Sequence, residues 1–496
     1  MANENIKPVQ KPVSKSSQND KKSFGHDVGK LVTGTIVAQV VGICLMPIIT
    51  RIFGPDIIGS ATVLISIVSV LTVVSCFLYE RAIILPKEDK DAGALFLSAI
   101  CILFAFSAIV TIVFLLFGDI MLGLLNQEGL KPYILIVPVL TFIDGLYLCF
   151  RYWNTRRKRF GTQAVTQALQ SVSGSVAKLS FGIGGFINPG SILFGQLAGQ
   201  VTGTLILGFQ IIRSDLQVIW SSISLSNMKQ QMKRYRKFPL IYTWSELLNS
   251  ASSSLPAFLL SSFFSSAIVG FYSLSAQILS LPLHFIGSSI GQVFFQRAAV
   301  AKHEGTLHSL VEDVVSMLMS ISFVPFAVLM ATGGTLFSVV FGAEWYEAGV
   351  FAQILALWML IVFFTNPIST LVSVLEIQEF GLKMNILIFI LRLVTLTIGG
   401  VVGNIYLGLV LFMLSGVFFN GFYNYYVVKK SGGKFKNIRL KVQKYLVLGI
   451  MILIGLSCIQ LLPIPDIVLF VLCCIVVLVY EGVLFLKNPD IRSYIR

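Results

Sequence analysis

Long apolar spans separated by short polar turns run through most of the chain. The first pair shows the pattern: an apolar span near 31–53, a polar turn at 54–56, a second span near 57–79, and then the charged run LPKEDKDA at 85–92. This order predicts a helical hairpin in lipid. The spans hold about twenty continuous apolar residues rather than ten alternating ones, which indicates helices and not a β-barrel.

Counting such spans predicts about fourteen transmembrane helices and therefore an all-α polytopic membrane protein. The spans lie near 31–53, 57–79, 92–117, 132–152, 161–184, 190–212, 239–264, 267–293, 311–332, 347–373, 381–402, 404–428, 444–462 and 465–486. The fifth is rich in Gln, Ser and Gly, and the seventh contains Glu246, Asn249 and a run of serines. The loops near 118–131 and 333–346 look like amphipathic turns on the membrane surface.

The charge of successive loops alternates in a way that agrees with this count. If the N-terminal tail lies in the cytoplasm, the loops that return there hold clusters of Arg and Lys, as at 156–159 and 429–444. The loops between them hold little beyond Arg51 and Lys131. Because cytoplasmic loops of membrane proteins are rich in Lys and Arg, we expect both termini in the cytoplasm. The same loops explain the net charge of +14, so we expect no nucleic-acid partner.

Composition agrees with a membrane protein and offers little catalytic chemistry. The chain is 55% hydrophobic and 12% charged, whereas soluble domains are about 25% charged. All seven cysteines fall within apolar spans, and the four histidines are scattered, so neither set has the spacing of metal ligands. No Walker A sequence is present. We therefore expect no cofactor, no metal and no enzymatic activity.

An internal repeat divides the chain into two halves. FGPDIIGS at 53–60 and FSSAIVGF at 264–271 share a Phe, four variable residues, an aliphatic residue and a Gly. A weaker match relates 116–129 to 336–349. Both matches put the repeat boundary near residue 235, after six spans. An even number of spans makes the repeats parallel, with a pseudo-two-fold axis along the membrane normal.

The predicted organisation has four parts. They are a disordered basic tail at 1–29, a six-helix lobe at 30–235, a second six-helix lobe at 236–430, and a basic loop with two additional helices at 431–496. Two facing bundles favour a transporter with its site between them. A channel is less favoured, because no pore loop is repeated.

Two cations lie inside spans that correspond in the two halves. Arg392 lies near the middle of the eleventh span, and Lys178 lies in the fifth. An intramembrane charge costs about 2.5–3.5 kcal/mol, so each needs a reason. Two cations facing one cavity would suit an anion, especially a diphosphate. The alternatives are that Lys178 snorkels outward and that Arg392 pairs with a carboxylate.

Acids and amides inside the spans are further candidates. Asp144 and Glu246 could couple transport to protons or ions, or they could pair with Arg or cap a broken helix. Glutamines recur in three spans, where their amides could bind sugar hydroxyls or bond helix to helix. These are Gln163, Gln167, Gln170, Gln196, Gln200, Gln277 and Gln292.

Four stretches resemble a known family. They are PIITRIFGPDIIG at 47–59, YERAIILPKEDKDA at 79–92, LPLHFIGSSIGQVFFQRAA at 281–299 and FGAEWYEAGVFAQILALWML at 341–360. They are similar to the bacterial polysaccharide transporters, the Wzx-type oligosaccharide flippases of the multidrug/oligosaccharidyl-lipid/polysaccharide exporter superfamily. The resemblance covers nearly the whole chain from about residue 28.

The resemblance implies a function and a cellular setting. Such proteins flip an undecaprenyl-diphosphate-linked oligosaccharide outward across the bacterial cytoplasmic membrane by alternating access, through a cationic cavity, for surface polysaccharide assembly. Membrane lipids and other polysaccharide-assembly proteins are the implied partners, and we expect a monomer. Arg51, Arg81 and Arg297 lie in the family-like stretches, at span ends where gating or headgroup contact is expected. Lys178 and Arg392 match no family motif.

Three other functions compete with this interpretation. A cation-coupled multidrug exporter of the same superfamily would prefer an acidic cavity. A flippase for the peptidoglycan lipid precursor would share the architecture and a similar substrate. A polysaccharide polymerase or ligase needs a sizeable outer loop for its catalytic groups, and the predicted outer loops are short.

Overall fold

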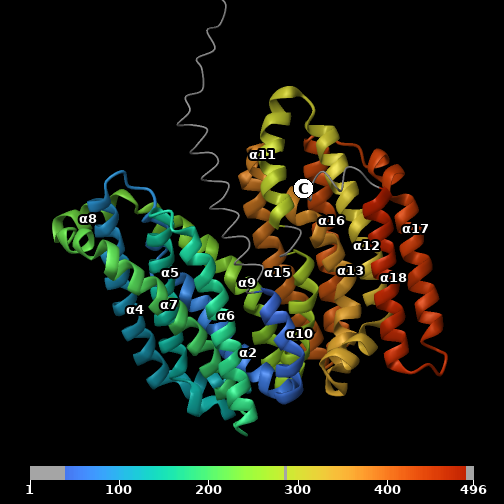
Figure 1. The fold of residues 1–496 in the computed structure, drawn as a ribbon, viewed down its shortest axis with the longest axis horizontal. Helices are drawn as coiled ribbons and strands as arrows, with labels where there is room; N and C mark the ends of the chain where they lie inside the picture. Colours follow the sequence, from blue (N-terminus) through green and yellow to red (C-terminus); the bar gives the residue numbers. More distant parts are fainter. Residues whose placement is uncertain (1–38, 284–287, 488–496) are drawn as a thin grey trace, which may run out of the picture.

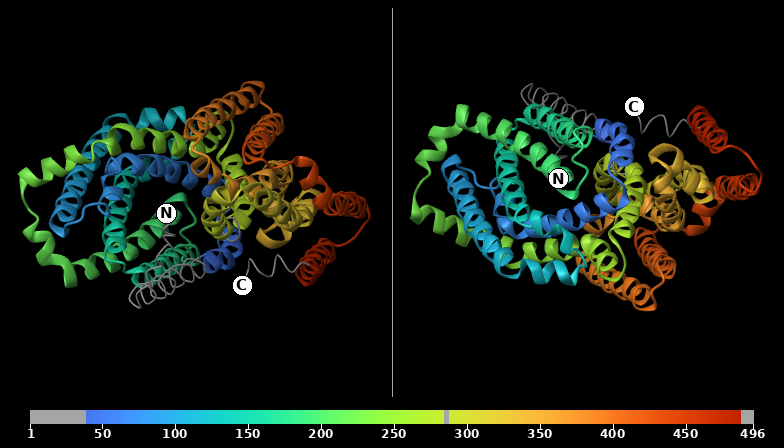
Figure 2. Two further views of the ribbon diagram at one scale, coloured as in Figure 1. Left: turned by 90° about the horizontal axis from the view of Figure 1, so that it is seen from above. Right: turned by 90° about the horizontal axis from the view of Figure 1, so that it is seen from below.

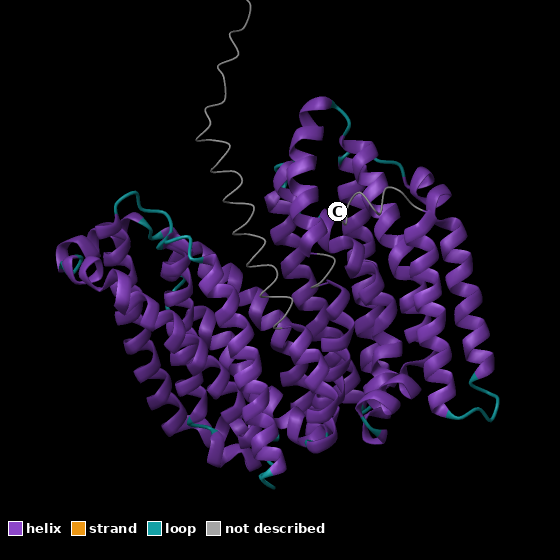
Figure 3. Ribbon diagram, in the orientation of Figure 1, coloured by secondary structure: helices purple, strands orange, loops and turns teal. Residues whose placement is uncertain are grey.

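The computed structural model describes residues 39–283 and 288–487, and all structural statements below refer to them. Every regular element in these ranges is helical, as Figure 3 shows. The predicted tail at 1–29 lies outside the described residues, as do residues 31–38 of the first predicted span.

The N-terminal lobe contains six main helices. They are the first helix, described from Gln39 to Ile52, then α2 (Pro55–Ser75), α4 (Asp89–Leu124), α5 (Ile136–Arg156), α6 (Phe160–Ile183) and α7 (Pro189–Ser221). Short helices α3 (Tyr79–Ala82) and η1 (Glu128–Tyr133) connect some of them. Helix α8 (Leu225–Arg234) lies across one end of the lobe (Figure 1).

The C-terminal lobe begins with a short π-helix, η2 (Phe238–Tyr242), that leads into α9 (Thr243–Phe263). The lobe continues with α10 (Ser266–Pro282), α11 (Ser288–Glu304), α12 (Leu307–Phe341), η4 (Ala343–Trp345), α13 (Tyr346–Ile368), α14 (Leu371–Val374), α15 (Gln378–Val402) and α16 (Ile405–Lys430). Two added helices, α17 (Phe435–Ile459) and α18 (Asp466–Lys487), pack against α12. Figure 2 shows them on the side of this lobe that faces away from the N-terminal lobe.

All fourteen predicted spans overlap helices, which confirms the all-α fold class. Ten helices in the described ranges are long and apolar enough to cross a membrane, and Gln39–Ile52 and Ser266–Pro282 are shorter apolar helices. Helices α6 and α9, the polar fifth and seventh spans, are the remaining two. The number of crossings stays a prediction, because the structure contains no membrane.

The predicted surface turns after the third and ninth spans are wrong in their first parts. Helix α4 continues to Leu124 and α12 continues to Phe341, where turns were expected to begin near 118 and 333. Apart from Asp119, the sequence carries no charge and stays mostly apolar through 118–124 and 333–341. A helix keeps its backbone hydrogen bonds internal, so the apolar residues extend it rather than end it.

Local sequence signals mark where several helices begin. Pro55 and Pro189 stand at the first position of α2 and α7, where a missing N–H costs nothing. Side chains of Asn188, Asn404 and Ser265 cap α7, α16 and α10 by accepting a hydrogen bond from a backbone N–H three residues on.

The two lobes form a V. They meet at one end of the molecule, the seam end, and diverge toward the other, the open end, where α8 and the turn between α11 and α12 lie (Figure 1). Helices α2 and α10 run along the junction and pack against each other. The candidate site depends on how these two helices meet.

Helices α2 and α10 cross at two glycines. A Cβ added to Gly59 would lie 1.8 Å from the Ser266 carbonyl oxygen, and one added to Gly270 would lie 2.1 Å from that of Pro55. Ser266 and Gly270 follow Pro55 and Gly59 by the same 211 positions. Each lobe therefore gives the other the same contact, as a local two-fold relation does. These are the two glycines that the sequence repeat matched.

Hydrogen bonds at the seam end repeat this reciprocity. The Thr50 hydroxyl donates to the Phe341 carbonyl oxygen over 3.3 Å, and the Ser261 hydroxyl donates to that of Leu125 over 2.5 Å. Ser261 follows Thr50 by the same 211 positions. Both acceptors stand at the end of a long helix, α12 or α4, where carbonyl groups lack partners within the helix.

Further bonds complete this contact, which we call the seam. Trp345 Nε1 donates to the Thr50 carbonyl oxygen over 3.0 Å, and Asn126 Nδ2 donates to that of Ser262 over 2.6 Å. Gln127 Nε2 donates to Ser261 Oγ over 3.0 Å. The seam therefore joins the lobes through both halves of the repeat.

Candidate functional site

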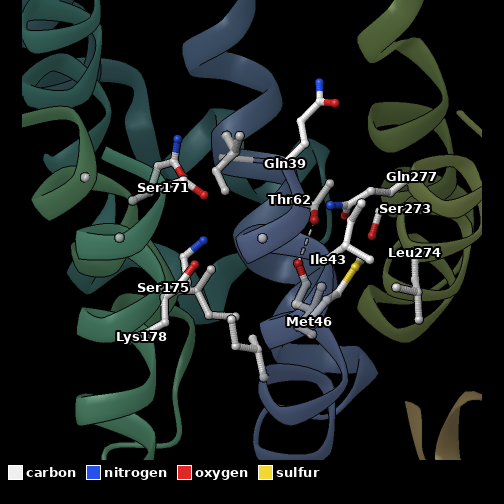
Figure 4. A pocket seen from close by; sticks show the side chains of 18 of the residues that line it. Gln39, Ile43, Met46, Thr62, Ser171, Ser175, Lys178, Ser273, Leu274 and Gln277 are labelled. Atoms are coloured by element: carbon white, nitrogen blue, oxygen red, sulfur yellow. Dashed lines mark hydrogen bonds between the residues drawn. The ribbon is translucent and has the colours of Figure 1, made fainter. Parts of the chain in front are cut away.

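A cavity of about 650 Å³ lies between the lobes. The first helix, α2, α6 and α7 of the N-terminal lobe and α10 of the C-terminal lobe form its walls. In Figure 4, Ser171, Ser175 and Lys178 of α6 lie across the first helix and α2 from Ser273 and Gln277 of α10. The cavity is thus shared by both lobes.

The lining is unusually polar for a membrane protein. Lys178 is the one charged residue among the described lining residues, which include no carboxylate. The amides and hydroxyls belong to Gln39, Thr50, Thr62, Gln167, Gln170, Ser171, Ser175, Gln196, Gln200, Ser273, Gln277 and Ser280. Predicted residues Lys178, Gln167 and Gln277 are therefore brought together.

Helix α6, the fifth predicted span, is rich in polar residues because one of its faces lines the cavity. Gln167, Ser171, Ser175 and Lys178 recur at intervals of three or four residues, which places them on one side of a helix. Ser171 and Ser175 were not among the predicted site residues, although this spacing marks them. A polar stripe on an otherwise apolar span is the signal that identifies them.

Glycines of α7 allow α6 to approach closely. A Cβ on Gly195 would lie 2.3 Å from Lys178 Cγ, and one on Gly199 would lie 2.8 Å from the Gln170 carbonyl oxygen. Gly203 continues the four-residue spacing. Such a row of small residues is typical of closely packed membrane helices. The Lys178 stem passes over Gly195, so the row also shapes the cavity wall.

Lys178 has no ion pair or hydrogen bond to any described residue. Its side chain lies in the cavity between helices rather than along the lipid surface. Since an intramembrane cation is costly, an uncompensated one in a polar cavity indicates a place for an anion.

Arg392 does not line this cavity. Its Nη1 donates to the carbonyl and hydroxyl oxygens of Ser252 on α9, over 3.1 and 3.0 Å. Its guanidinium carbon lies 5.7 Å from the Trp358 ring centre and 5.9 Å from that of Phe412, within cation–π range. The structure thus separates Arg392 from Lys178, although both were expected to face one cavity, and it gives Arg392 no carboxylate partner among the described residues.

Asp144 lies beside the main cavity in a smaller one of about 190 Å³. Ile65 and Gln196 line both cavities. Asp144 Oδ1 is buried and has no hydrogen-bond partner in the described residues, and the same holds for the hydroxyls of Thr72 and Thr141. Buried polar groups are normally satisfied, so this cluster could accept a partner that the described residues do not supply, such as a proton, an ion or water.

Glu246 is paired across the lobes. Arg81 Nη2 lies 3.0 Å from Glu246 Oε1, and both side chains are partly exposed near the open end. Close by, the Ser250 hydroxyl donates to the Ser69 carbonyl oxygen over 3.4 Å. Of the two predicted acids, Glu246 thus adopts the alternative of pairing with an arginine.

The other two predicted arginines lie away from the cavity. Arg51 Nη2 donates to the Val339 carbonyl oxygen over 2.7 Å, so Arg51 belongs to the seam. Arg297 has an exposed side chain on α11. Gating or headgroup contact stays a prediction for both residues.

Residues 48–350 match the family model described as "Polysaccharide biosynthesis protein". This match covers more than half of the chain. The chain belongs to the polysaccharide biosynthesis protein family. The resemblance found in the sequence is thereby confirmed at the level of the family. No curated protein sequence matches the chain.

Solved structures of transporters share this family member's fold. "Lipid II flippase MurJ, inward closed conformation" has a TM-score of 0.71 at 12% identity, covering 94% of this chain and 99% of that chain. An outward-facing multidrug resistance MATE family transporter of the MOP superfamily has a TM-score of 0.54 at 14% identity, with 87% and 96% covered. A mutant of the Vibrio cholerae MATE transporter VcmN has 0.53 at 15%, with 84% and 98% covered. At these identities the similarity is one of fold.

Proposed function

We propose that the chain is a flippase that moves a polyprenyl-diphosphate-linked oligosaccharide from the cytoplasmic to the outer leaflet of the bacterial cytoplasmic membrane. The observation that carries this proposal is the lining of the main cavity, where one lysine that has no ion pair with any described residue lies among amides and hydroxyls. Membership in a polysaccharide biosynthesis family supports it. So does a fold similar to that of a lipid II flippase.

The chemistry of the lining suits both parts of such a substrate. Glutamine and serine side chains donate to and accept from sugar hydroxyls. The Lys178 ammonium attracts the diphosphate as a point charge. A cavity for cationic drugs would instead hold a carboxylate, and the described lining has none. This difference favours the flippase over the multidrug exporter.

The V shape supports the direction and the mechanism. The open end has the basic segments that are expected in the cytoplasm, such as 156–159 and 225–237. The substrate then enters from the cytoplasmic leaflet while the seam keeps the outer side closed. Breaking the seam and closing the open end would expose the same cavity to the other side. We propose a monomer for this cycle, with other polysaccharide-assembly proteins as partners outside it.

Asp144 and Arg392 have supporting roles in this proposal. A buried carboxylate without a cationic partner is costly, so a proton or a monovalent metal ion neutralises Asp144. Because Gln196 lines both cavities, the charge of Asp144 would influence the wall that contacts the substrate. Arg392 holds the C-terminal lobe together in this state and contacts the anion only if its helix reorients during the cycle.

Reconstituted flipping tests the proposal. The full chain is placed in proteoliposomes with a fluorescent polyprenyl-diphosphate oligosaccharide, and a membrane-impermeant quencher reports how much reaches the accessible leaflet. We expect Lys178→Gln to slow flipping about tenfold or more and Lys178→Arg to retain most of it, because the contact is electrostatic. Lys131→Gln is the matched control, since Lys131 is exposed and paired with Asp119.

Two further substrates separate the alternatives. A fluorescent peptidoglycan lipid precursor and a cationic dye are tested in the same vesicles. Faster movement of the precursor than of the oligosaccharide would assign the chain to the precursor. Export of the dye alone would make it a drug exporter, and wild-type flipping by Lys178→Gln would remove the basis of the proposed site.

A further inference from the structure

A second cavity of about 400 Å³ lies at the open end, where the chain passes from one lobe to the other. Its walls come from α3 and the residues after it, the end of α8, the π-helix η2, and the start of α9. None of its lining residues lines the substrate cavity. It is therefore a separate candidate site.

Positive charge exceeds negative charge in this second cavity. Its charged lining residues are Arg81, Arg234, Lys237 and Glu246. Glu246 pairs with Arg81 over 3.0 Å. Arg234 and Lys237 are exposed, and neither has an ion pair with a described residue. Two cations from the segment between the lobes are thus left for an anion.

Glu80, next to Arg81, adds less opposing charge than an ordinary glutamate. Its side chain is buried, and this burial raises its pKa to about 7. At neutral pH a large share of Glu80 is therefore protonated. The electrostatic potential at Arg81 is therefore more positive than it would be beside a fully ionised Glu80.

Aromatic side chains place this cavity at the depth of lipid headgroups. Tyr242, which lines the cavity, is 52% exposed. Trp244, two residues further on, is 63% exposed, and Trp220, near the end of α7, is 72% exposed. Tryptophan and tyrosine gather at the level where hydrocarbon meets water. Leu240 and Ile241, also exposed, continue the apolar surface on one side. The cavity therefore lies at the level where phosphate groups of a leaflet are found.

The wall of the cavity is stiffened by packed rings. The Phe238 ring centre lies 6.4 Å from that of Tyr235 and 5.2 Å from that of Tyr242. The Arg234 guanidinium lies over the Tyr235 ring at 5.5 Å. The π-helix holds Phe238 and Tyr242 in this arrangement, and such insertions are frequent at functional sites. The basic groups are thus carried on a shaped surface rather than a loose loop.

We propose that this cavity binds the phosphate headgroup of an anionic lipid from the leaflet at the open end. Arginine forks and lysine ammonium groups bind phosphate through charge-assisted hydrogen bonds. A phosphate held by Arg81 and Arg234 would link α3 of the N-terminal lobe to the segment between the lobes. Lipid composition would then set how firmly that segment is held. This inference goes beyond the proposed function and does not require it.

Lipid binding to the full-length purified chain tests the inference. Native mass spectrometry counts bound phosphatidylglycerol and phosphatidylcholine of identical acyl chains, each titrated separately. We expect tighter binding of the first phosphatidylglycerol, and about a tenfold loss of that affinity in the double variant Arg234→Gln, Lys237→Gln. The matched control is Lys229→Gln, Lys233→Gln, which removes the same charge from α8 at residues outside the cavity lining.

Three results would overturn the inference. They are equal affinity for the two lipids, equal loss in both double variants, and displacement of phosphatidylglycerol by millimolar inorganic phosphate, which would assign the site to a free anion. Thermal unfolding of each variant verifies that it is folded. Flipping is not the measurement, so failure of the proposed function leaves this test intact.

Discussion

Lys178 and Arg392 stand on corresponding helices of the two lobes but have opposite surroundings. Helix α6 packs on the first helix at Gly182, where an added Cβ would lie 2.6 Å from Ile52. Helix α15 packs on α9 at Gly400, where it would lie 2.3 Å from Phe263. Phe263 follows Ile52 by 211 positions, the interval that also relates the crossing glycines. The two helices therefore occupy equivalent places.

The cations differ in their distance from these contacts. Lys178 lies four residues before Gly182, whereas Arg392 lies eight residues before Gly400. The difference is about one helical turn. Lys178 consequently reaches the cavity between the lobes, and Arg392 is enclosed by Ser252 and two aromatic rings. The two halves of the repeat therefore pack their helices alike, whereas the positions and surroundings of their intramembrane cations differ.

The largest expected effect is on stability, and it concerns the crossing of α2 and α10, to which both lobes contribute the same contact. Gly59→Ala and Gly270→Ala each put a methyl group against backbone atoms of the other lobe. We expect both to destabilise the protein by about 3 kcal/mol or more, at the upper end of overpacking. Thermal unfolding in detergent measures this, with Gly482→Ala as control because a Cβ there meets nothing within 4 Å. Unequal effects of the two variants would break the proposed equivalence.

Next in size is the contrast between the two cations. Arg392→Gln removes contacts with Ser252 and two rings, and we expect it to lower stability by about 1–3 kcal/mol. Lys178→Gln removes an uncompensated charge, and we expect unchanged or higher stability but much slower flipping. Unfolding and flipping are measured on the same preparations. If Arg392→Gln unfolds like wild type yet abolishes flipping, both cations serve the substrate and the comparison fails.

Asp144 is a second difference between the lobes, because it is an acid inside a span of the N-terminal lobe. The corresponding helix of the other lobe, α13, has no acid beyond Glu347 in its first turn. We expect flipping by the wild type to respond several-fold to an imposed proton or sodium gradient, and Asp144→Asn to lose this response. The mechanism is neutralisation of the carboxylate by the driving cation. A full response in the variant would place coupling elsewhere in the chain.

The smallest effects concern the seam. Thr50→Val and Ser261→Ala each remove one hydroxyl that donates to a helix-end carbonyl of the other lobe. We expect each to weaken the seam by about 1 kcal/mol. Spectroscopic distances between spin labels at the two lobes then report a larger share of molecules with a separated seam end. Similar shifts in both variants support reciprocity, whereas a shift in only one contradicts it.

The lipid environment made the positions of the helices predictable from the sequence, but not which helices pack against each other. Backbone groups in hydrocarbon must be paired within a helix, so apolar length alone located the spans. The same rule shows why the first parts of the expected turns near 118 and 333 are helical, since both segments remain mostly apolar. The repeat at Gly59 and Gly270 was also visible in the sequence. That these glycines touch could not be predicted, because the pattern carries no information about which helix each one faces.

The candidate site was predicted in part for a similar reason. Depth in the membrane singled out Lys178 and Arg392, but depth does not determine which neighbours surround a side chain. The spacing of Gln167, Ser171, Ser175 and Lys178 did contain that information for α6, because it gives one polar face. Arg392 has no such stripe around it in an apolar span. Its aromatic neighbours come from α13 and α16, which only the folded chain brings together.

The glycine crossing of α2 and α10 lies close to the seam end, and this position gives the molecule unequal lever arms. A rotation about the crossing displaces the nearby seam by little and carries the distant open end through a long arc. In the proposed cycle, the seam end would therefore open with the loss of a few hydrogen bonds. The open end would have to travel much farther in that cycle, so most of the displacement of lipid and water would occur there.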